Sequence, residues 1–399
     1  MDALDSNSVH AAPAATVGLV LPGGGARAAY QVGVLCAIAD LLPQAPNPFP
    51  VIVGTSAGAV SAAVLATEAF RWHRAIDALE RVWANFRVEQ VFRTDTASIL
   101  RAGLRWTAAL LSGGLLRPPL ALFDNSPLRE LLESRIHWSL LAASLRRGAL
   151  RSLALCATGY DTGTSVAFFA GDELVLDWER VRRVGRRTQL RLDHLMASMS
   201  VPLFFPPVAI DGEYYGDGAQ RQLWPLSPAI HLGADRLLIV GVRAQTQVAG
   251  RAPATGRTPP TAGQLFGYML DTLFMDQIFA NLEHVARLNE VVKLAPQAAP
   301  GMHKVATHLI VPSEDLRAIA LRHVKRLPRG LRALLRIMGA RGESGAEFAS
   351  YLMFDAAFTR ELIALGRRDA LAQSEQLLKF LGQDTLTRTM AFPAMPAGG

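Results

Sequence analysis

Residues 51–66 read VIVGTSAGAVSAAVLA, an apolar run followed by a Gly-x-Ser-x-Gly pentapeptide and then by small residues. The apolar run predicts a buried strand, and the small residues predict a helix. A serine at such a strand-to-helix turn is held on a strained elbow, as a nucleophile is. Because the elbow crowds its own backbone, the positions two before and two after the serine need very small residues. Gly54 and Gly58 meet this requirement, so Ser56 is the candidate nucleophile.

A second glycine-rich turn lies upstream, between a predicted buried strand at residues 17–21 and a predicted helix at residues 28–42. Gly23, Gly24 and Gly25 can direct their backbone N–H groups toward one point, and the start of the following helix adds positive potential there. The turn is therefore suited to binding an anion. In an acyl-transfer enzyme it would hold the oxyanion of the tetrahedral intermediate. Arg27 would either add a fixed cation or anchor the loop.

Two other interpretations of this turn stay open. The pattern Gly23-x-Gly25-x-x-Ala28 also fits a loose dinucleotide-binding sequence, which requires an acidic residue at the end of the next strand. The next predicted strand ends at Val53 and leads into the serine pentapeptide, and no Gly-x-x-x-x-Gly-Lys-Ser/Thr sequence is present. Nucleotide binding is therefore disfavoured. A purely structural glycine turn is the second alternative.

A third segment, YYGDGA at residues 214–219, contains Asp217. It follows alternating apolar and polar residues, which predict a hairpin-like pair of strands. An Asp between glycines is commonly a turn former that accepts hydrogen bonds from its own backbone. By itself the segment indicates only a tight turn.

In this order and spacing, the three segments resemble the patatin-like phospholipase family. The resemblance extends from residue 17 to about residue 242 and includes ASMSVPLFFPP at residues 197–207, which is similar to the family's Ala-Ser-x-Ala-x-Pro-x-x-Phe-x-Pro sequence. It implies a three-layer α/β/α fold with a mainly parallel central sheet. It also implies hydrolysis of phospholipids or lysophospholipids without a cofactor or metal, through a Ser–Asp dyad. In that dyad Ser56 is the nucleophile and Asp217 its base. The loop on the oxyanion side would consist of Gly23, Gly24, Gly25 and Arg27.

A carboxyl group with a reference pKa of about 3.9 is a weak base for a hydroxyl. We therefore expect burial near the glycine turn to raise the pKa of Asp217, which would make its carboxylate a better proton acceptor. Attack on an ester carbonyl would give an acyl-Ser56 intermediate, and water would then release the fatty acid.

Three positions depart from the family pattern. Ala28 and Ala219 stand where the family has Gly, and Leu223 stands where it has Asn. None of them replaces a reacting group, so they bear on loop geometry and substrate width. They also motivate an alternative function, a membrane-binding or regulatory protein on a patatin-like scaffold with weak or no hydrolysis.

A Ser-His-Asp triad is the enzymatic alternative, because the chain order Ser56, Asp217, His231 permits it. The serine, however, follows a single strand-helix unit, earlier than the sheet of an α/β-hydrolase normally allows. His231 lies in a predicted helix, and both it and His194 are interpreted as structural residues.

The chain has 399 residues, of which 50% are hydrophobic, enough for a large core. Cys36 and Cys156 indicate neither a disulfide framework nor a metal site, so we expect a reducing, cytoplasmic location, with the inner face of the membrane as a peripheral site. No stretch is long and apolar enough to span a bilayer. Residues 106–116 are expected either to form a lid that dips into a membrane or to pack as a core helix.

The net charge of +7 is carried almost wholly by arginine. A segment rich in Arg and Leu near the C-terminus contains no acidic residue, a pattern that attracts anionic phospholipid head groups. A solvated basic face is the alternative, while nucleic-acid binding is disfavoured because no zinc, RNP-like or helix-turn-helix signature accompanies the segment. Its basic residues are Arg317, Arg322, Lys325, Arg326, Arg329, Arg332, Arg336 and Arg341.

Alternating strands and helices along the chain predict an α/β domain, and the later residues predict a helical extension. We expect a flexible tail at residues 1–14, without the features of a signal peptide or anchor, an acyl hydrolase domain at 15–313 and the extension at 314–399. Within the domain we expect a helical, insertion-like region at 91–150 and a loop at 244–262. Residues 264–293 predict one long amphipathic helix.

Overall fold

The computed structural model describes residues 15–93, 104–105, 107–109, 111–113, 115, 120–244, 259–295, 297, 302–340 and 342–383. Three sequence predictions fall wholly or partly outside these residues. They concern the tail at 1–14, the loop at 244–262 and the segment at 106–116, and they stay predictions.

A mixed sheet of ten strands forms the centre of the described chain, with the order β10-β9-β1-β2-β3-β4-β6-β5. Neighbouring strands from β10 to β3 are parallel, whereas β4 and β8 join β3 in antiparallel fashion and β7 pairs with β8. The strands are β1 (Val17–Leu21), β2 (Val51–Thr55), β3 (Ser152–Gly159), β4 (Ser165–Gly171), β5 (Trp178–Arg180), β6 (Arg183–Arg187), β7 (Val208–Ile210), β8 (Glu213–Asp217), β9 (Arg236–Val240) and β10 (Ala306–Ile310).

The central parallel strands are buried along their whole length because helices flank the sheet. Every residue of β1, β2 and β3 is buried, which explains the continuous apolar runs in their sequences. The α-helices between β1 and β9 are α1 (Ala29–Leu41), α2 (Ala57–Thr67), α3 (Trp72–Trp83), α5 (Ser126–Arg135), α6 (Ser139–Arg146), α7 (Leu192–Ser198) and α8 (Ser227–His231). The predicted α/β class, with a mostly parallel central sheet, flanking helices and C-terminal helices, is confirmed.

The long helix predicted at residues 264–293 is interrupted once in the structure. The segment expected as one long helix consists of α9 (Ala262–Asp271), a π-helical turn called η6 (Thr272–Asp276) and α10 (Gln277–Leu294). A π turn inserts an extra residue into the helical repeat and is often found at functional sites. The α-helices after β10 are α11 (Leu316–His323), α12 (Arg329–Ile337), α13 (Glu343–Leu352), α14 (Ala356–Leu371) and α15 (Ser374–Phe380).

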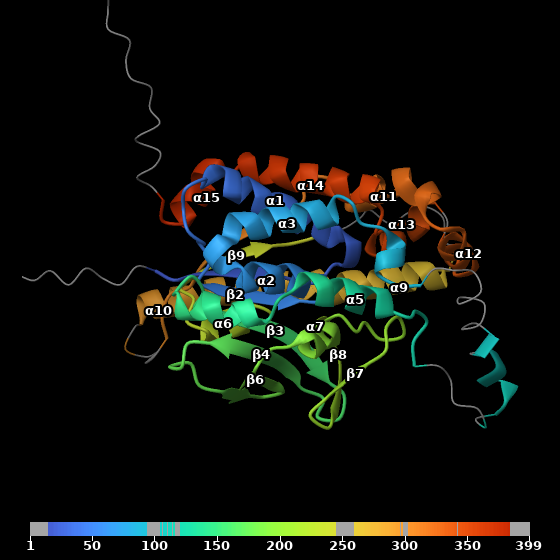
Figure 1. Cartoon of the computed structure of the whole chain (residues 1–399), viewed down its shortest axis with the longest axis horizontal. Coiled ribbons are helices and arrows are strands. Elements are labelled where there is room, and N and C mark those ends of the chain that lie inside the picture. The colour runs from blue at the N-terminus through green and yellow to red at the C-terminus, as the bar shows by residue number, and fades with distance from the viewer. Residues whose placement is uncertain are drawn as a thin grey trace, which may run out of the picture.

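The C-terminal helices pack directly on the first helix of the chain. Figure 1 shows α14, near the red end of the colour scale, lying alongside the blue α1. Glycines permit this close approach, since a Cβ atom at Gly33 would lie 2.0 Å from the carbonyl oxygen of Ile363, and one at Gly366 would lie 2.2 Å from that of Tyr30. The segment expected as an extension at 314–399 thus shares one hydrophobic core with the sheet.

Within the described residues, no helix is long and apolar enough to cross a membrane.

Candidate active site

Ser56 stands on a sharp turn between β2 and α2. Its backbone angles are φ 54° and ψ −129°, a conformation that residues with a side chain rarely adopt. Both flanking glycines are required by close backbone contacts. A Cβ atom at Gly54 would lie 2.5 Å from Cα of Ala59, and one at Gly58 would lie 2.2 Å from the carbonyl oxygen of Leu21. The strained elbow predicted from the sequence is therefore present, and such strain is typical of functional sites.

The elbow is supported by the segment at residues 197–207. The amide nitrogen of Ser56 donates a hydrogen bond to Oγ of Ser198 at 3.0 Å. The carbonyl oxygen of Ser56 accepts one from the amide of Ala59 at 2.9 Å, at the start of α2. Ser198 ends α7 and is fully buried, so the side chain that holds the elbow is itself fixed by packing.

Asp217 lies at the end of β8, where its side chain is only 1% exposed. Its carboxyl Oδ1 accepts a hydrogen bond from the amide of Ala219 at 2.9 Å, and its own amide donates one to the carbonyl of Ser200 at 2.9 Å. Burial raises the pKa of Asp217 to about 7, against smaller opposing contributions from the Ser56 hydroxyl and the Ala219 amide. The buried position of Asp217 thus accounts for the raised pKa expected from the sequence, with desolvation as the cause.

The structure brings Ser56 and Asp217 close together, although they lie far apart in the chain. The Ser56 hydroxyl is near enough to lower the pKa of the carboxyl. The other carboxyl oxygen of Asp217, Oδ2, is buried and accepts no hydrogen bond of normal geometry from any described residue. The two groups therefore face each other in a loose contact, a common arrangement in enzymes without bound substrate.

The glycine turn lies directly beside the candidate nucleophile. A Cβ atom at Gly23 would lie 2.9 Å from Cβ of Ser56, so no side chain fits there. Gly25 has φ 52°, and the turn is closed by a hydrogen bond from the amide of Arg27 to the carbonyl of Gly24 at 3.1 Å. The turn is placed where an oxyanion-binding loop must be. That role for Gly23, Gly24 and Gly25 stays a prediction.

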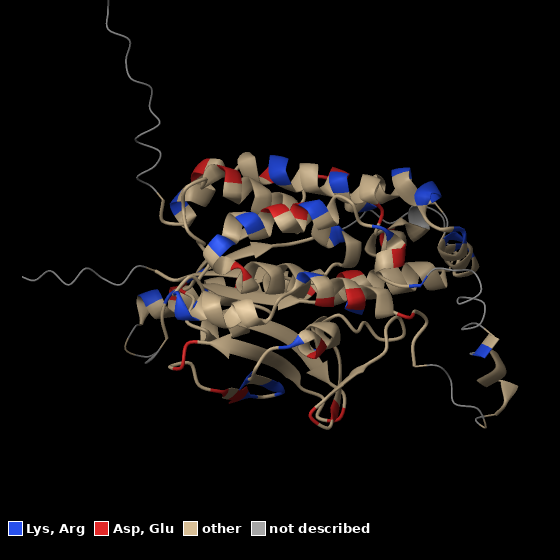
Figure 2. Ribbon diagram, in the orientation of Figure 1, with Lys and Arg blue, Asp and Glu red and all other residues tan. Residues whose placement is uncertain are grey.

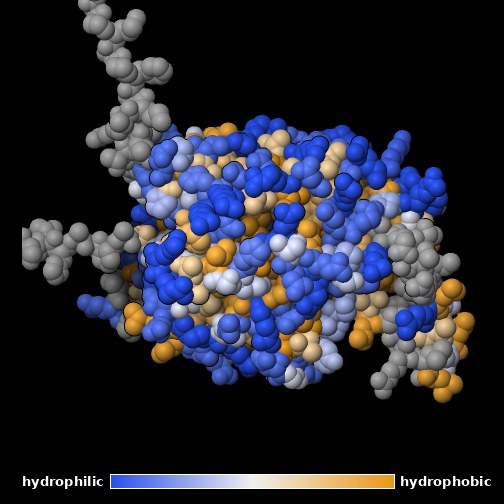
Figure 3. Space-filling model, viewed as in Figure 1, coloured by the Kyte–Doolittle hydropathy of each residue, from blue (hydrophilic) through white to orange (hydrophobic). Residues whose placement is uncertain are grey.

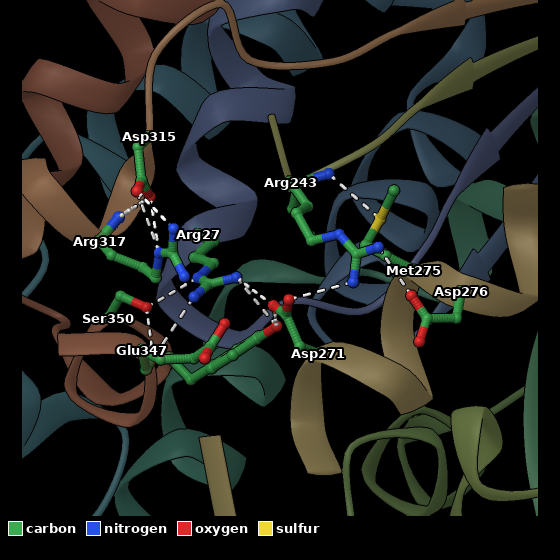
Figure 4. Close-up of polar contacts among 11 residues, drawn as sticks. Arg27, Arg243, Asp271, Met275, Asp276, Asp315, Arg317, Glu347 and Ser350 are labelled. Carbon is green, nitrogen blue, oxygen red and sulfur yellow. Dashed lines mark hydrogen bonds and ion pairs between the residues drawn. The ribbon is translucent and has the colours of Figure 1, made fainter. Parts of the chain in front are cut away.

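Arg27 is an anchor of this turn. Its guanidinium is 1% exposed and donates to Oγ of Ser350 at 2.7 Å, to Oδ1 of Asp271 at 2.8 Å and to the hydroxyl of Tyr351 at 3.0 Å. Figure 4 shows these contacts with α9 and α13, and Nη2 also points to the carbonyl of Glu347 at 3.4 Å. The structure therefore shows the anchoring role of Arg27, while its role as a fixed cation on the oxyanion side stays a prediction.

A cavity of about 390 Å³ opens beside Ser56 and Gly25. Its walls are mostly apolar, and hydrophobic residues are visible between hydrophilic ones over α2 and α3 on the face shown in Figure 3. Sequence reasoning missed these walls. The available signals were the apolar spacing of Val60 and Val64 along α2 and of Leu79, Val82 and Trp83 along α3. The other apolar lining residues include Ala57, Phe86, Leu128, Leu131, Leu132, Phe204, Phe205, Leu270, Phe274, Tyr351, Leu352 and Phe354.

The departures from the family pattern lie outside this cavity. Ala28 is fully buried, and Leu223 is 59% exposed on the surface. Ala219 supplies its backbone amide to Asp217, which any residue except proline can do. None of the three lines the cavity, so the structure does not support the expected effect on substrate width.

Neither histidine of the triad alternative lines the cavity with the candidate nucleophile. His231 contacts the carbonyl of Ser227 through Nδ1 at 2.8 Å, and its ring stacks on Trp178. His194 is fully buried against the edge of Phe168, and burial lowers its pKa to about 4. Both are structural residues, as the sequence interpretation proposed. In the described part of the chain, no three His, Cys, Asp or Glu side chains lie close enough to hold a metal ion.

Several solved structures resemble this fold at low similarity. Human GIVD cytosolic phospholipase A2 in complex with methyl gamma-linolenyl fluorophosphonate has 17% identity and a TM-score of 0.42, covering 94% of this chain and 60% of the human chain. A second structure of human GIVD cytosolic phospholipase A2 has 15% identity and a TM-score of 0.43, covering 93% of this chain and 60% of the human chain. VipD from Legionella pneumophila has 14% identity and a TM-score of 0.30, covering 95% and 79%. No functional argument rests on similarities this low.

This chain thus spans about 60% of the length of the human enzyme. No curated protein sequence matches it. The family model described as Patatin-like phospholipase matches residues 19–230, which include the elbow, the glycine turn and Asp217. Because this match covers more than half of the chain, the protein belongs to the patatin-like phospholipase family.

Proposed function

We propose that this protein is a lipid acyl hydrolase that cleaves carboxylic esters of phospholipids or lysophospholipids through a Ser56–Asp217 dyad. The observation that carries the proposal is a serine on a strained elbow that lies beside a buried carboxyl and lines an apolar cavity. Membership of a phospholipase family supports a lipid ester as the substrate. The decisive experiment is covalent labelling of Ser56, described in the Discussion.

The proposed reaction begins with proton transfer from Oγ of Ser56 to the carboxylate of Asp217 while Oγ attacks the ester carbonyl carbon. The negative charge on the carbonyl oxygen is stabilised by the backbone N–H groups of the turn Gly23, Gly24 and Gly25. The C–O bond to the alcohol breaks, and the alcohol leaves with the proton from Asp217. Water then attacks the acyl-Ser56 ester while Asp217 accepts a proton from it. The bond from the acyl carbon to Oγ breaks, Asp217 returns the proton to Oγ of Ser56, and the fatty acid is released.

The cavity is suited to the acyl chain. Val60 and Val64 line it on one side of α2, four and eight residues after Ser56. A helix rises 1.5 Å per residue, so these side chains stand roughly 6 Å and 12 Å along the helix from the nucleophile. An extended acyl chain bound to Ser56 would therefore pass Val60 before Val64.

Val64→Phe is expected to shorten the acyl chain that the cavity accepts. We expect kcat/KM for long-chain p-nitrophenyl esters to fall at least about 10-fold, the scale of steric discrimination in an apolar pocket, while the butyrate ester is little affected. Val60→Phe, closer to Ser56, should also reduce hydrolysis of medium-length esters. The measurement is kcat/KM across a series of esters. Equal losses at every chain length, in both variants, would contradict this path for the chain.

We also propose that the enzyme acts at a membrane surface, and that the main contact lies outside the basic segment at residues 317–341. Arg317, Arg322 and Arg326 of that segment form ion pairs with acidic residues, and Arg341 lies outside the described residues. At least three basic residues of the segment are therefore balanced by acidic partners. Outside the segment, Figure 2 shows both signs of charge mixed over α3, α5 and α14.

An exposed apolar stripe on α9 supports membrane contact better. Leu265, Tyr268 and Met269 are 56%, 70% and 37% exposed and share one helix face, and Ile337 at the nearby end of α12 is 83% exposed. Basic Arg336 is exposed next to Ile337. Apolar and basic residues together favour the surface of an anionic bilayer.

The double variant Leu265→Glu/Tyr268→Glu is expected to bind anionic vesicles several-fold more weakly, because it places two negative charges against the lipid surface. Co-sedimentation with phosphatidylglycerol vesicles measures this, and hydrolysis of a soluble ester should be unchanged. The matched control is Leu174→Glu/Val181→Glu, which alters two apolar residues, exposed at least as much, in the turns before and after β5. Unchanged vesicle binding in the α9 variant would contradict this contact.

A further inference from the structure

Two segments beyond the family-matched region reach the candidate active site. The match ends at residue 230, whereas α9 with η6 and the end of α13 come later in the chain. They supply five cavity-lining residues, namely Leu270, Phe274, Tyr351, Leu352 and Phe354. The C-terminal half of the chain therefore forms a wall of the site.

The same segments enclose the glycine turn on two sides. A Cβ atom at Gly23 would lie 2.3 Å from Cε1 of Phe274, so the phenyl ring rests against the glycine. A Cβ atom at Gly25 would lie 2.3 Å from the carbonyl oxygen of Tyr351. Displacement of either segment would therefore leave the turn without the contacts that hold it beside Ser56.

Asp271 binds residues of the glycine turn and of α13, and so holds these segments to the turn. Its Oδ1 accepts hydrogen bonds from Nη1 of Arg27 at 2.8 Å and from the hydroxyl of Tyr351 at 2.7 Å, and its Oδ2 accepts one from Arg243 at 3.1 Å. The Arg27 guanidinium also lies 3.9 Å from the centre of the Tyr351 ring. Figure 4 shows Asp271 between the two arginines.

Asp271 is charged in this setting and lies next to the π turn. Although burial alone would raise its pKa, Arg27, Tyr351 and Arg243 hold the pKa below its ordinary value. The π turn begins at the next residue and directs Phe274 toward Gly23. A single ionised side chain therefore links the anchor of the glycine turn, the cavity wall of α13 and the helix that carries Phe274.

We propose that Asp271 is a positioning residue for ester hydrolysis: by binding Arg27 and Tyr351, it holds the glycine turn in the geometry that stabilises the oxyanion. The inference rests on the proposed function and extends it to a part of the chain that the family match does not cover. Asp271 acts through other residues and does not touch the reacting atoms.

The test is Asp271→Asn in the full-length protein, an isosteric change that removes the charge. A slight displacement of the turn is expected to lower kcat at least about 10-fold, since misplacements near 1 Å can cost about 100-fold. KM for a soluble p-nitrophenyl ester should change much less, because the apolar wall is retained. The concentration of folded enzyme is measured by letting a fluorophosphonate react with Ser56 to completion. Each rate is divided by this concentration, so that unfolded protein is not counted.

A matched control separates positioning from general destabilisation. Asp369 is also a buried acid in the C-terminal helices, and it accepts a hydrogen bond from Tyr30 of α1 at 3.1 Å. It lines neither the cavity nor the glycine turn. Asp369→Asn is expected to lower the melting temperature while leaving kcat per reactive Ser56 within about 2-fold of wild type.

Tyr351→Phe is the second variant, and it decides the matter if Asp271→Asn does not fold. It removes the hydroxyl that bonds Asp271 and Arg27 but keeps the ring, so kcat should fall several-fold.

In every variant that folds, the pH at which activity is half-maximal should stay near that of wild type, because Asp217 remains the base. If wild type is active and kcat is unchanged in both variants, the positioning role of Asp271 is wrong, while the proposed function still stands. A wild type without labelling or hydrolysis would instead overturn the proposed function, and this inference with it.

Discussion

Ser56→Ala is expected to abolish hydrolysis of lipid esters and covalent labelling by a fluorophosphonate probe. Without Oγ no acyl-enzyme can form, and loss of a serine nucleophile lowers kcat on the order of a million-fold in a well-studied hydrolase. The measurements are release of fatty acid from a phospholipid panel and mass spectrometry of the labelled protein. In wild type, the label should reside on Ser56.

Ser61→Ala is the matched control for this experiment. Ser61 lies on the same helix, is fully buried and does not line the cavity. Its variant should hydrolyse and label like wild type. Hydrolysis that persists in Ser56→Ala would show that another group is the nucleophile. A wild type that binds vesicles but neither hydrolyses nor labels would favour the alternative of a membrane-binding scaffold.

Asp217→Asn is expected to lower kcat by about a thousand-fold, within the range that general base catalysis contributes. The amide keeps the shape of the side chain but cannot accept the proton of Ser56. Labelling by the probe should be correspondingly slow, since it requires the same proton transfer. Activity close to that of wild type would remove Asp217 from the mechanism and reopen the search for a base.

The pH dependence of wild type should identify the same carboxyl. Burial raises the pKa of Asp217 to about 7, and only the ionised form can act as a base. Activity should therefore be low at pH 5, rise with pH and reach half of its maximum near pH 7. The residual activity of Asp217→Asn should lack this rise. A half-maximum near pH 4 in wild type would indicate a carboxyl that is not buried.

The raised pKa of Asp217 also predicts that Asp217→Asn, although it lowers kcat, makes the folded protein more stable at alkaline pH. Between about pH 4 and pH 7 the folded protein holds a proton on Asp217 that the unfolded chain has lost, so unfolding becomes easier as pH rises through this window. At pH 8 the buried carboxylate costs on the order of a few kcal/mol, since each unit of pKa shift corresponds to about 1.4 kcal/mol. Asp217→Asn avoids this cost. Its melting temperature should exceed that of wild type at pH 8 and approach it at low pH.

The local geometry of the site could be predicted from the sequence, whereas its surroundings could not. Gly54 and Gly58 indicate the elbow because a sharp turn crowds its own backbone, although the contact that excludes a side chain at Gly58 is with Leu21 of β1. Asp217, in contrast, looks like an ordinary turn former, and only its resemblance to a family motif indicated a base. Its raised pKa followed once burial was assumed, because desolvation acts on any carboxyl.

The role of Arg27 shows where prediction from sequence ends. Its place after three glycines suits either a cation or an anchor, and the choice depends on what lies around it. The partners are Asp271, Ser350 and Tyr351, which follow Arg27 by most of the length of the chain. No periodicity or motif in those later helices indicates that they contact the turn.

Short-range backbone constraints and the apolar patterns of single elements were enough to predict the strand-elbow-helix unit, the glycine turn and the mostly parallel sheet. The family resemblance added the pairing of Ser56 with Asp217, whereas the course of the apolar cavity and the anchoring of Arg27 by Asp271 are visible only in the folded chain. Those features depend on side chains from separate elements that pack around one core, and such packing is a property of the whole folded chain.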